Sequence, residues 1–169
     1  MIQTVYVVIT PVRDEAEHIG KTIQSMAAQT ILPRCWVIVD DGSTDQTARI
    51  IDSAAQAYPW IRVVHRADRG FRKSGGGVIE AFYEGWPLIA DDAWDFLVKL
   101  DGDLSFAPYY FAACLERFKS DPRLGLGGGT VCVVRNDRLE VDSFGDPPFH
   151  VRGATKIYRR KCWEQISPL

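Results

Sequence analysis

Short apolar runs alternate with amphipathic stretches along this chain, and the alternation restricts the fold more than any other feature. Four runs rich in β-branched or apolar residues predict strands that are covered on both faces: 5–9 (VYVVI), 36–39 (WVIV), 61–64 (IRVV) and 96–100 (FLVKL). Stretches with apolar residues at helical spacing follow them, at 15–29, 43–57, 76–88 and 109–120. The pattern predicts an α/β fold, a mostly parallel sheet flanked by helices and joined by right-handed crossovers.

The ends of these elements carry further signals. Asp14 is placed to cap the first helix, and Ser43 with Gln46 fits a capping box at the start of the second. Residues 124–134 and 151–158 resemble additional strands, and residues 161–166 resemble a short helix. Because the chain stops directly after this helical pattern, we expect residues 1–169 to be one domain that belongs to a longer protein.

Composition excludes several classes of protein. A length of 169 residues suits a single domain, and 20 basic against 22 acidic residues leave a net charge of −2, which does not favour nucleic-acid binding. No apolar run approaches the roughly 20 residues that span a bilayer, and the N-terminus lacks the pattern of a signal peptide. Four widely spaced cysteines fit a reduced, cytoplasmic chain.

Polar clusters follow each of the four predicted strands. In parallel α/β sheets the ligand binds at the carboxyl ends of the strands. The sharpest cluster is Asp101-Gly102-Asp103, in which two carboxylates flank a glycine that permits a tight turn. Two acids this close repel each other unless a cation lies between them, and such oxygen ligands suit Mg²⁺ or Mn²⁺. An acidic turn is the alternative interpretation, because Asp-Gly is a common turn dipeptide.

Asp40 and Asp41 end the second predicted strand in the same way. A carboxylate at this position can accept a hydrogen bond from the N–H of a uracil ring or from a ribose hydroxyl. Alternatively, Asp41 serves the turn and Asp45 the dipole of the following helix. That alternative accounts less well for Asp40, a charge at the end of an apolar strand.

Two other segments point to the same edge of the sheet. Pro11, Arg13 and Glu15 follow the first strand, although a helix start with acids in its first turn explains them as well. Residues 65–73 concentrate cations that suit a pyrophosphate, with a solvated loop as the alternative. Neither a Walker loop nor Gly-x-Gly-x-x-Gly follows the first strand, which argues against a dinucleotide-binding dehydrogenase.

Taken together, residues 7–15 (VVITPVRDE), 39–45 (VDDGSTD) and 99–103 (KLDGD) resemble the family 2 glycosyltransferases, inverting enzymes with the GT-A fold. The resemblance implies a GT-A, Rossmann-like sheet, truncated at its C-terminal side, and a nucleotide-sugar-binding domain over residues 1–169. It implies transfer of a sugar from a UDP- or GDP-linked donor to an acceptor hydroxyl on a saccharide or lipid carrier. It leaves open whether the full-length protein associates with the cytoplasmic face of a membrane.

The resemblance also assigns roles to residues. Pro11, Arg13 and Glu15 would line the nucleotide pocket, Asp41 would contact the base, and Asp40 would support the loop. The remaining roles concern the diphosphate, the sugar and the metal. Lys73 would lie near the diphosphate, Asp101 would face the ribose or sugar, and Asp103, with Asp101, would coordinate Mn²⁺ or Mg²⁺.

One part of the family pattern is missing. Inverting transfer needs a general base, and in this family an acid well beyond the metal-binding triplet supplies it. Only Glu164 follows the segment that precedes this acid, and it comes too early. We therefore expect the catalytic base to lie outside this chain. The alternatives are a domain that binds nucleotide and metal without turnover, or a sugar nucleotidyltransferase.

Overall fold

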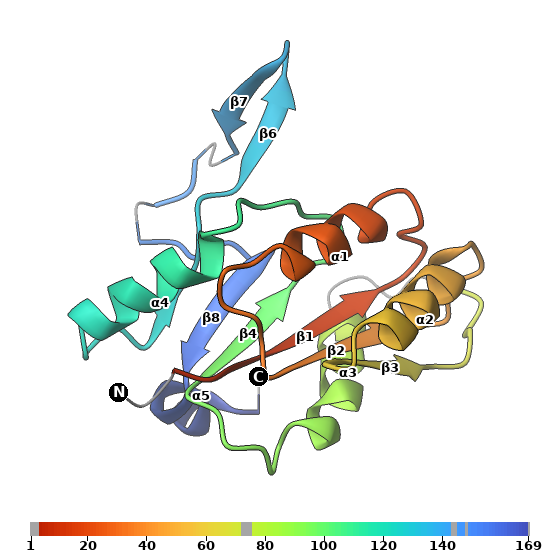
Figure 1. The fold of residues 1–169 in the computed structure, drawn as a ribbon, viewed down its shortest axis with the longest axis horizontal. Helices are drawn as coiled ribbons and strands as arrows, with labels where there is room; N and C mark the ends of the chain where they lie inside the picture. Colours follow the sequence, from red (N-terminus) through yellow and green to blue (C-terminus); the bar gives the residue numbers. More distant parts are fainter. Residues whose placement is uncertain (1–3, 72–75, 143–144, 148, 169) are drawn as a thin grey trace.

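The computed structural model describes residues 4–71, 76–142, 145–147 and 149–168. A six-stranded sheet in the order β3-β2-β1-β4-β8-β5 forms the centre of the molecule (Figure 1). Its strands are β1 (Tyr6–Val12), β2 (Cys35–Asp40), β3 (Ile61–His65), β4 (Phe96–Leu100), β5 (Leu126–Gly127) and β8 (Thr155–Arg159). The helices are α1 (Ile19–Ala27), α2 (Thr47–Ala57), α3 (Gly76–Gly85), the 3₁₀ helix η1 (Trp86–Leu88), α4 (Tyr110–Ser120) and α5 (Arg160–Ile166).

The sheet is mixed but mostly parallel. β3, β2, β1 and β4 run in the same direction, whereas β8 pairs antiparallel with β4 and β5 pairs antiparallel with β8. The predicted fold class, a mostly parallel sheet flanked by helices, is confirmed. Because β1, β2 and β4 are parallel neighbours, the loops that follow them meet at one edge of the sheet.

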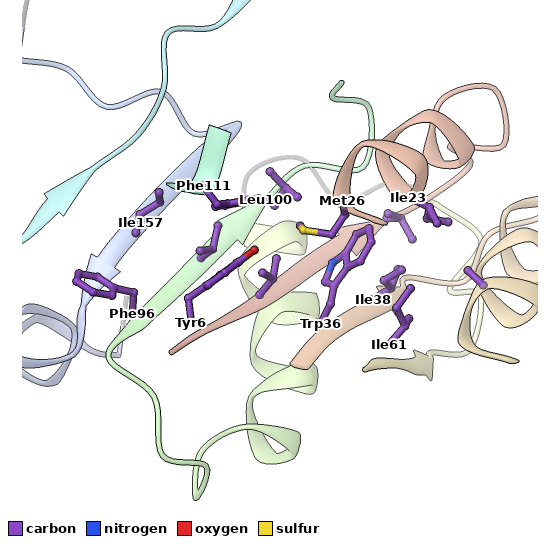
Figure 2. Packing of buried hydrophobic residues seen from close by; sticks show 14 of the residues in the cluster. Tyr6, Ile23, Met26, Trp36, Ile38, Ile61, Phe96, Leu100, Phe111 and Ile157 are labelled. Atoms are coloured by element: carbon purple, nitrogen blue, oxygen red, sulfur yellow. The ribbon is translucent and has the colours of Figure 1, made fainter. Parts of the chain in front are cut away.

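Apolar clusters cover both faces of the sheet. Helices α1, α2 and α4 pack on one face, where the side chains of Ile23 and Met26 lie close to Trp36 and Ile38 (Figure 2). On the other face, residues of α3 and α5 such as Phe82 and Trp163 pack against the remaining strand residues. This two-sided burial explains why the strands are continuous apolar runs. No helix among the described residues is long and apolar enough to cross a membrane.

The first two helices begin later than the capping signals predict. Asp14 has a φ of +54°, and its Oδ1 accepts a hydrogen bond from the backbone N–H of Thr44 at 2.7 Å. Ser43 Oγ in turn accepts one from the backbone N–H of Asp14 at 3.0 Å. The predicted caps are therefore wrong, because these short side chains satisfy the N–H groups of the neighbouring loop instead of their own helix.

Residues 124–134, which the sequence pattern favours as one strand, form two. β5 joins the main sheet, and β6 (Cys132–Arg135) pairs with β7 (Arg138–Val141) in a separate hairpin that projects from the body (Figure 1). The turn between β6 and β7 places Asn136 and Asp137 at positive φ, 50° and 59°. Asn and Asp tolerate this conformation better than most residues, so the pair Asn136-Asp137 is the sequence feature that could have predicted the hairpin turn.

Candidate functional site

A cavity of about 180 Å³ lies at the carboxyl ends of β1, β2 and β4. Its lining combines residues of the predicted motifs with residues of α3: Pro11, Val12, Arg13, Glu15, Asp41, Gly77, Val78, Ala81, Asp101, Gly102 and Asp103. Three segments that are far apart in the sequence thus contribute acids to one hollow. Asp40 does not line this cavity, and Lys73 lies outside the described residues.

Asp40 is buried beneath the loop that follows β2. Its Oδ1 accepts a hydrogen bond from the backbone N–H of Ser43 at 2.9 Å, and its Oδ2 lies 3.1 Å from Nδ1 of His65. Nε2 of His65 lies 3.0 Å from Oδ1 of Asp52. Burial opposes protonation of His65, but its hydrogen bonds to Asp40 and Asp52 outweigh this and raise its pKa. Asp40 therefore holds the loop in place by charge-assisted hydrogen bonds.

Asp41 is also buried, but unlike Asp40 it lines the cavity. Its two carboxylate oxygens each accept a hydrogen bond from a guanidinium, Oδ1 from Arg66 and Oδ2 from Arg69, both at 2.5 Å. Arg13 donates to the backbone carbonyl of Asp41 at 2.6 Å and to Oδ1 of Asp68 at 2.7 Å. The cation-rich segment therefore neutralises Asp41, a role that the sequence did not reveal.

Gly42 allows the loops after β2 and β3 to approach each other. Its φ is +72°, in the left-handed region that glycine tolerates best. A Cβ at this position would lie 2.5 Å from Cα and 2.8 Å from the backbone N of Asp68. Only a residue without a side chain fits this backbone contact, so Gly42 helps to bring Arg66 and Arg69 within reach of Asp41.

The loop after β4 is more open. Asp101 pairs with Lys99, whose ammonium also donates to the carbonyl oxygen of Gly153 at 2.8 Å. Burial raises the pKa of Asp101, and Lys99 acts in the opposite direction. Asp103 is exposed, and among the described residues it has no hydrogen-bond or ion-pair partner. The chain therefore leaves the carboxylate of Asp103 available to a ligand.

Asp101 and Asp103 fit a hard divalent cation. Both residues line the same cavity, but neither this cavity nor any other part of the described ranges gathers three or more His, Cys, Asp or Glu side chains that could hold a metal ion by themselves. A two-carboxylate set is compatible with Mg²⁺ or Mn²⁺, because Mg²⁺ commonly binds through one or two carboxylates together with water and substrate phosphates. The donor chemistry thus favours a metal that completes its coordination with a phosphorylated ligand.

Glu164, the acid nearest in sequence to the expected position of a general base, lies far from this cavity. β8 runs antiparallel to β4, with Thr155 opposite Leu100 and Arg159 opposite Phe96. α5 follows β8, so it begins at the amino end of β4, the opposite edge of the sheet. There Glu164 is exposed and accepts a hydrogen bond from Arg160 at 3.1 Å.

Solved structures share this architecture. The mannosyltransferase PcManGT from Pyrobaculum calidifontis, solved in complex with GDP-Man and Mn²⁺, matches 99% of this chain and 48% of its own, with a TM-score of 0.69 and 20% identity. Staphylococcus aureus TarS, solved in complex with UDP-GlcNAc, matches 96% of this chain and 47% of its own, with a TM-score of 0.62 and 19% identity. At these identities the likeness establishes the fold, which is the GT-A fold of glycosyltransferases.

The sequence establishes the family. Residues 7–160 match the profile of glycosyl transferase family 2, so the chain belongs to this family, as its motifs predict. A curated relative, the poly-beta-1,6-N-acetyl-D-glucosamine synthase of Staphylococcus aureus (strain COL), is 30% identical over 115 residues. The matched region is 66% of this chain and 25% of the relative, so the chain spans about a quarter of that protein's length.

Proposed function

We propose that this chain is the donor-binding part of a metal-dependent, inverting glycosyltransferase. The reaction is transfer of a sugar from a UDP- or GDP-linked donor to an acceptor hydroxyl. The observation that carries the proposal is the presence of Asp41, Asp101 and Asp103 in one cavity at the carboxyl ends of parallel strands. Family membership supports it, as do neighbours of the same fold that were solved with GDP-Man or UDP-GlcNAc.

The nucleotide occupies the β1 and β2 side of the cavity. Asp41 lies at its border, with its carboxylate oriented by two arginines, and contacts the base. Pro11, Arg13 and Glu15 form the adjoining wall. Lys73 lies near the diphosphate in this proposal, which also suits the cationic character of the segment that contains it.

The ribose or sugar and the cation occupy the β4 side. Asp101 faces the ribose or sugar, and Asp101 and Asp103 are the residues that would hold Mn²⁺ or Mg²⁺. When bound, the cation would neutralise the negative charge of the diphosphate as it leaves the sugar. The half-buried position of Asp101 supports this role, because carboxylates in partly desolvated sites interact more strongly with a cation than those in bulk water.

The acid that deprotonates the acceptor lies outside residues 1–169 in this proposal. The carboxylates of the cavity, Glu15, Asp41, Asp101 and Asp103, already have binding roles, and Glu164 is at the opposite edge of the sheet. We therefore expect this chain to bind donor and metal but to transfer sugar poorly by itself. Efficient transfer to an acceptor by residues 1–169 alone would contradict this part of the proposal.

A thermal-shift titration tests donor binding directly. UDP, GDP and ADP are each added with and without Mn²⁺, and Ca²⁺ without nucleotide controls for cation effects on the fold. Ligands that bind the native state raise the melting temperature by mass action, so UDP or GDP should produce a shift that requires the metal, and ADP a smaller one. The absence of a metal-dependent shift with either UDP or GDP would overturn the proposed function.

A further inference from the structure

A second cavity, of about 160 Å³, borders the donor cavity and shares Val78 with it. It lies on the α3 face of the sheet, between α3 and strands β4 and β8. Apart from Gly153, its lining consists of apolar side chains and two lysines: Val78, Ile79, Phe82, Lys99, Lys156 and Tyr158. Val78 also lines the first cavity and Lys99 pairs with Asp101, but the proposed function assigns no donor-binding role to any of these residues.

The two lysines are direct neighbours across the sheet. Lys99 of β4 is opposite Lys156 of β8 in the antiparallel register. Side chains in opposite positions have Cβ atoms about 5 Å apart, and like charges placed in this way are destabilising. Both side chains lie on the face that α3 covers, since Leu97 and Tyr158, two positions away on their strands, belong to the apolar cluster on that face.

The charge of this pair is only partly compensated. Lys99 uses two of its three ammonium hydrogens for Asp101 and for the carbonyl oxygen of Gly153. Lys156 is half-buried, and within the described part of the chain it has neither a hydrogen-bond nor an ion-pair partner. A partly desolvated, unpaired ammonium is unfavourable, so a bound anion would offset the cost of keeping it here.

The rest of the cavity is apolar and partly open to solvent. Phe82 and Tyr158 are buried, whereas Val78 and Ile79 of α3 are 45% and 42% exposed. Exposed β-branched side chains beside an uncompensated cation suit a ligand with two parts, an acidic group and an apolar body. The position beside Asp101, at the β4 side of the donor cavity, is where the acceptor would meet the sugar.

We propose that Lys99 and Lys156 form a subsite for an acidic head group, such as a phosphate, carried by an acceptor whose apolar body lies on Val78, Ile79 and Phe82. The assignment of this ligand as the acceptor rests on the proposed glycosyltransferase function. The binding site itself does not, because its residues are separate from those assigned to the base and the metal. The substrate class is therefore an amphiphilic acid rather than a neutral saccharide.

Calorimetric titration of the purified chain with three probes separates the parts of the ligand. Octyl phosphate below its micellar concentration carries both parts, inorganic phosphate carries only the acid, and octyl glucoside only the apolar chain. Octyl phosphate should bind at least about tenfold more tightly than either of the others. Equal affinity for octyl glucoside and octyl phosphate would overturn the proposal, and so would equal affinity for inorganic phosphate and octyl phosphate, which would indicate a site for the free anion.

Matched lysine variants locate the site. Lys156→Met removes the uncompensated charge and should weaken octyl phosphate binding by about tenfold, as expected for loss of a hydrogen bond to a charged group. Lys161→Met removes the same charge from an exposed position on α5 and should leave binding unchanged. Equal weakening in both variants would indicate nonspecific attraction and overturn the proposal. The metal-dependent UDP or GDP shift, measured on the same Lys156→Met sample, should persist, so failure of the donor site would be recognised separately.

Discussion

The two acidic loops at the candidate site follow parallel strands at the same edge of the sheet, but their carboxylates differ in burial and in hydrogen-bond partners. At the start of the loop after β2, Asp40 and Asp41 are both buried, and their carboxylate oxygens are hydrogen-bonded to Ser43, His65 and two arginines. In the loop of residues 101–103, Asp101 is half-buried with one lysine partner, and Asp103 is exposed.

This difference indicates that the carboxylates of the first loop stabilise the folded protein, whereas the second loop keeps carboxylate oxygens available for a ligand. Carboxylates that already have strong partners contribute to the stability of the fold and present a fixed surface to a ligand. A carboxylate without a partner contributes little to stability but keeps its oxygens available for a cation. Removing the Asp41 carboxylate should therefore lower the stability of the folded state, whereas removing the Asp103 carboxylate should change ligand binding with little effect on stability.

The largest expected effect is on stability, in Asp41→Ala. Removing this carboxylate leaves the half-buried guanidiniums of Arg66 and Arg69 without their common partner, which should cost about 3 kcal/mol and lower Tm by on the order of 10 °C. Differential scanning calorimetry without ligand measures this change. Asp103→Ala is the matched control and should stay within about 0.5 kcal/mol of wild type. A fall in Tm of similar size in both variants would erase the distinction between the loops.

The next effect is on ligand binding, in Asp103→Ala. At a nucleotide concentration about 100 times the Kd, binding stabilises the native state by about 2.7 kcal/mol. We expect Asp103→Ala to lose the part of this stabilisation that depends on Mn²⁺, because its carboxylate is the available oxygen ligand of the cavity. Thermal shift with UDP or GDP, with and without Mn²⁺, measures it. A wild-type metal dependence in this variant would remove Asp103 from the metal site.

The glycines of the two loops provide a third contrast. Gly42→Ala should cost at least about 2 kcal/mol, because it combines a positive φ with a contact to the backbone of Asp68. Gly102→Ala should cost about 1 kcal/mol, because its Cβ meets the Cγ1 side-chain atom of Val12, at 2.5 Å, which can shift more easily than backbone. Chemical denaturation of both variants gives the two free energies of unfolding. A smaller loss of stability in Gly42→Ala than in Gly102→Ala would mean that the loop after β2 can shift to accommodate a side chain despite its backbone contact with Asp68.

The smallest effect is a pH dependence confined to the first loop. Because the pKa of His65 is raised in the folded protein, its contribution to stability is present below about pH 6.5, the unfolded pKa, and is lost as the pH rises through the folded value. His65→Gln should therefore be less stable than wild type at pH 6 and nearly equal to it at pH 8.5. The half-exposed ring limits the difference to about 1 kcal/mol or less. Urea denaturation of both proteins at pH 6 and pH 8.5 measures the two free energies of unfolding. If the variant and wild type differ by the same amount at both pH values, His65 does not form a charged bridge between Asp40 and Asp52.

Sequence patterns predicted the sheet better than the helix starts. The runs 36–39 and 96–100 lie in β2 and β4 because a strand that is covered on both faces must be apolar throughout. Asp14 and Ser43 misled the prediction of the helix starts. A short polar side chain can cap its own helix or bond a neighbouring loop, and the distance between loops is not a local property.

The acids of the candidate site were predictable for a topological reason. Parallel neighbouring strands bring the residues that follow them to one edge of the sheet, so the strand pattern alone predicts that Asp41, Asp101 and Asp103 lie together, as they do in the cavity. Their partners were not predictable. The pairing of Asp41 with Arg66 and Arg69 depends on the close contact between two loops, which Gly42 permits.

By itself, the sequence determined the α/β class, the family and the acids at the strand ends, because these follow from apolar periodicity and from short motifs. Tertiary structure alone decided which acids are neutralised and which remain available. It also decided that β8 runs antiparallel, which places Lys156 opposite Lys99 and carries Glu164 away from the cavity. The physical reason is that burial, charge compensation and strand register depend on residues far apart in the chain, and local sequence does not encode the distances between them.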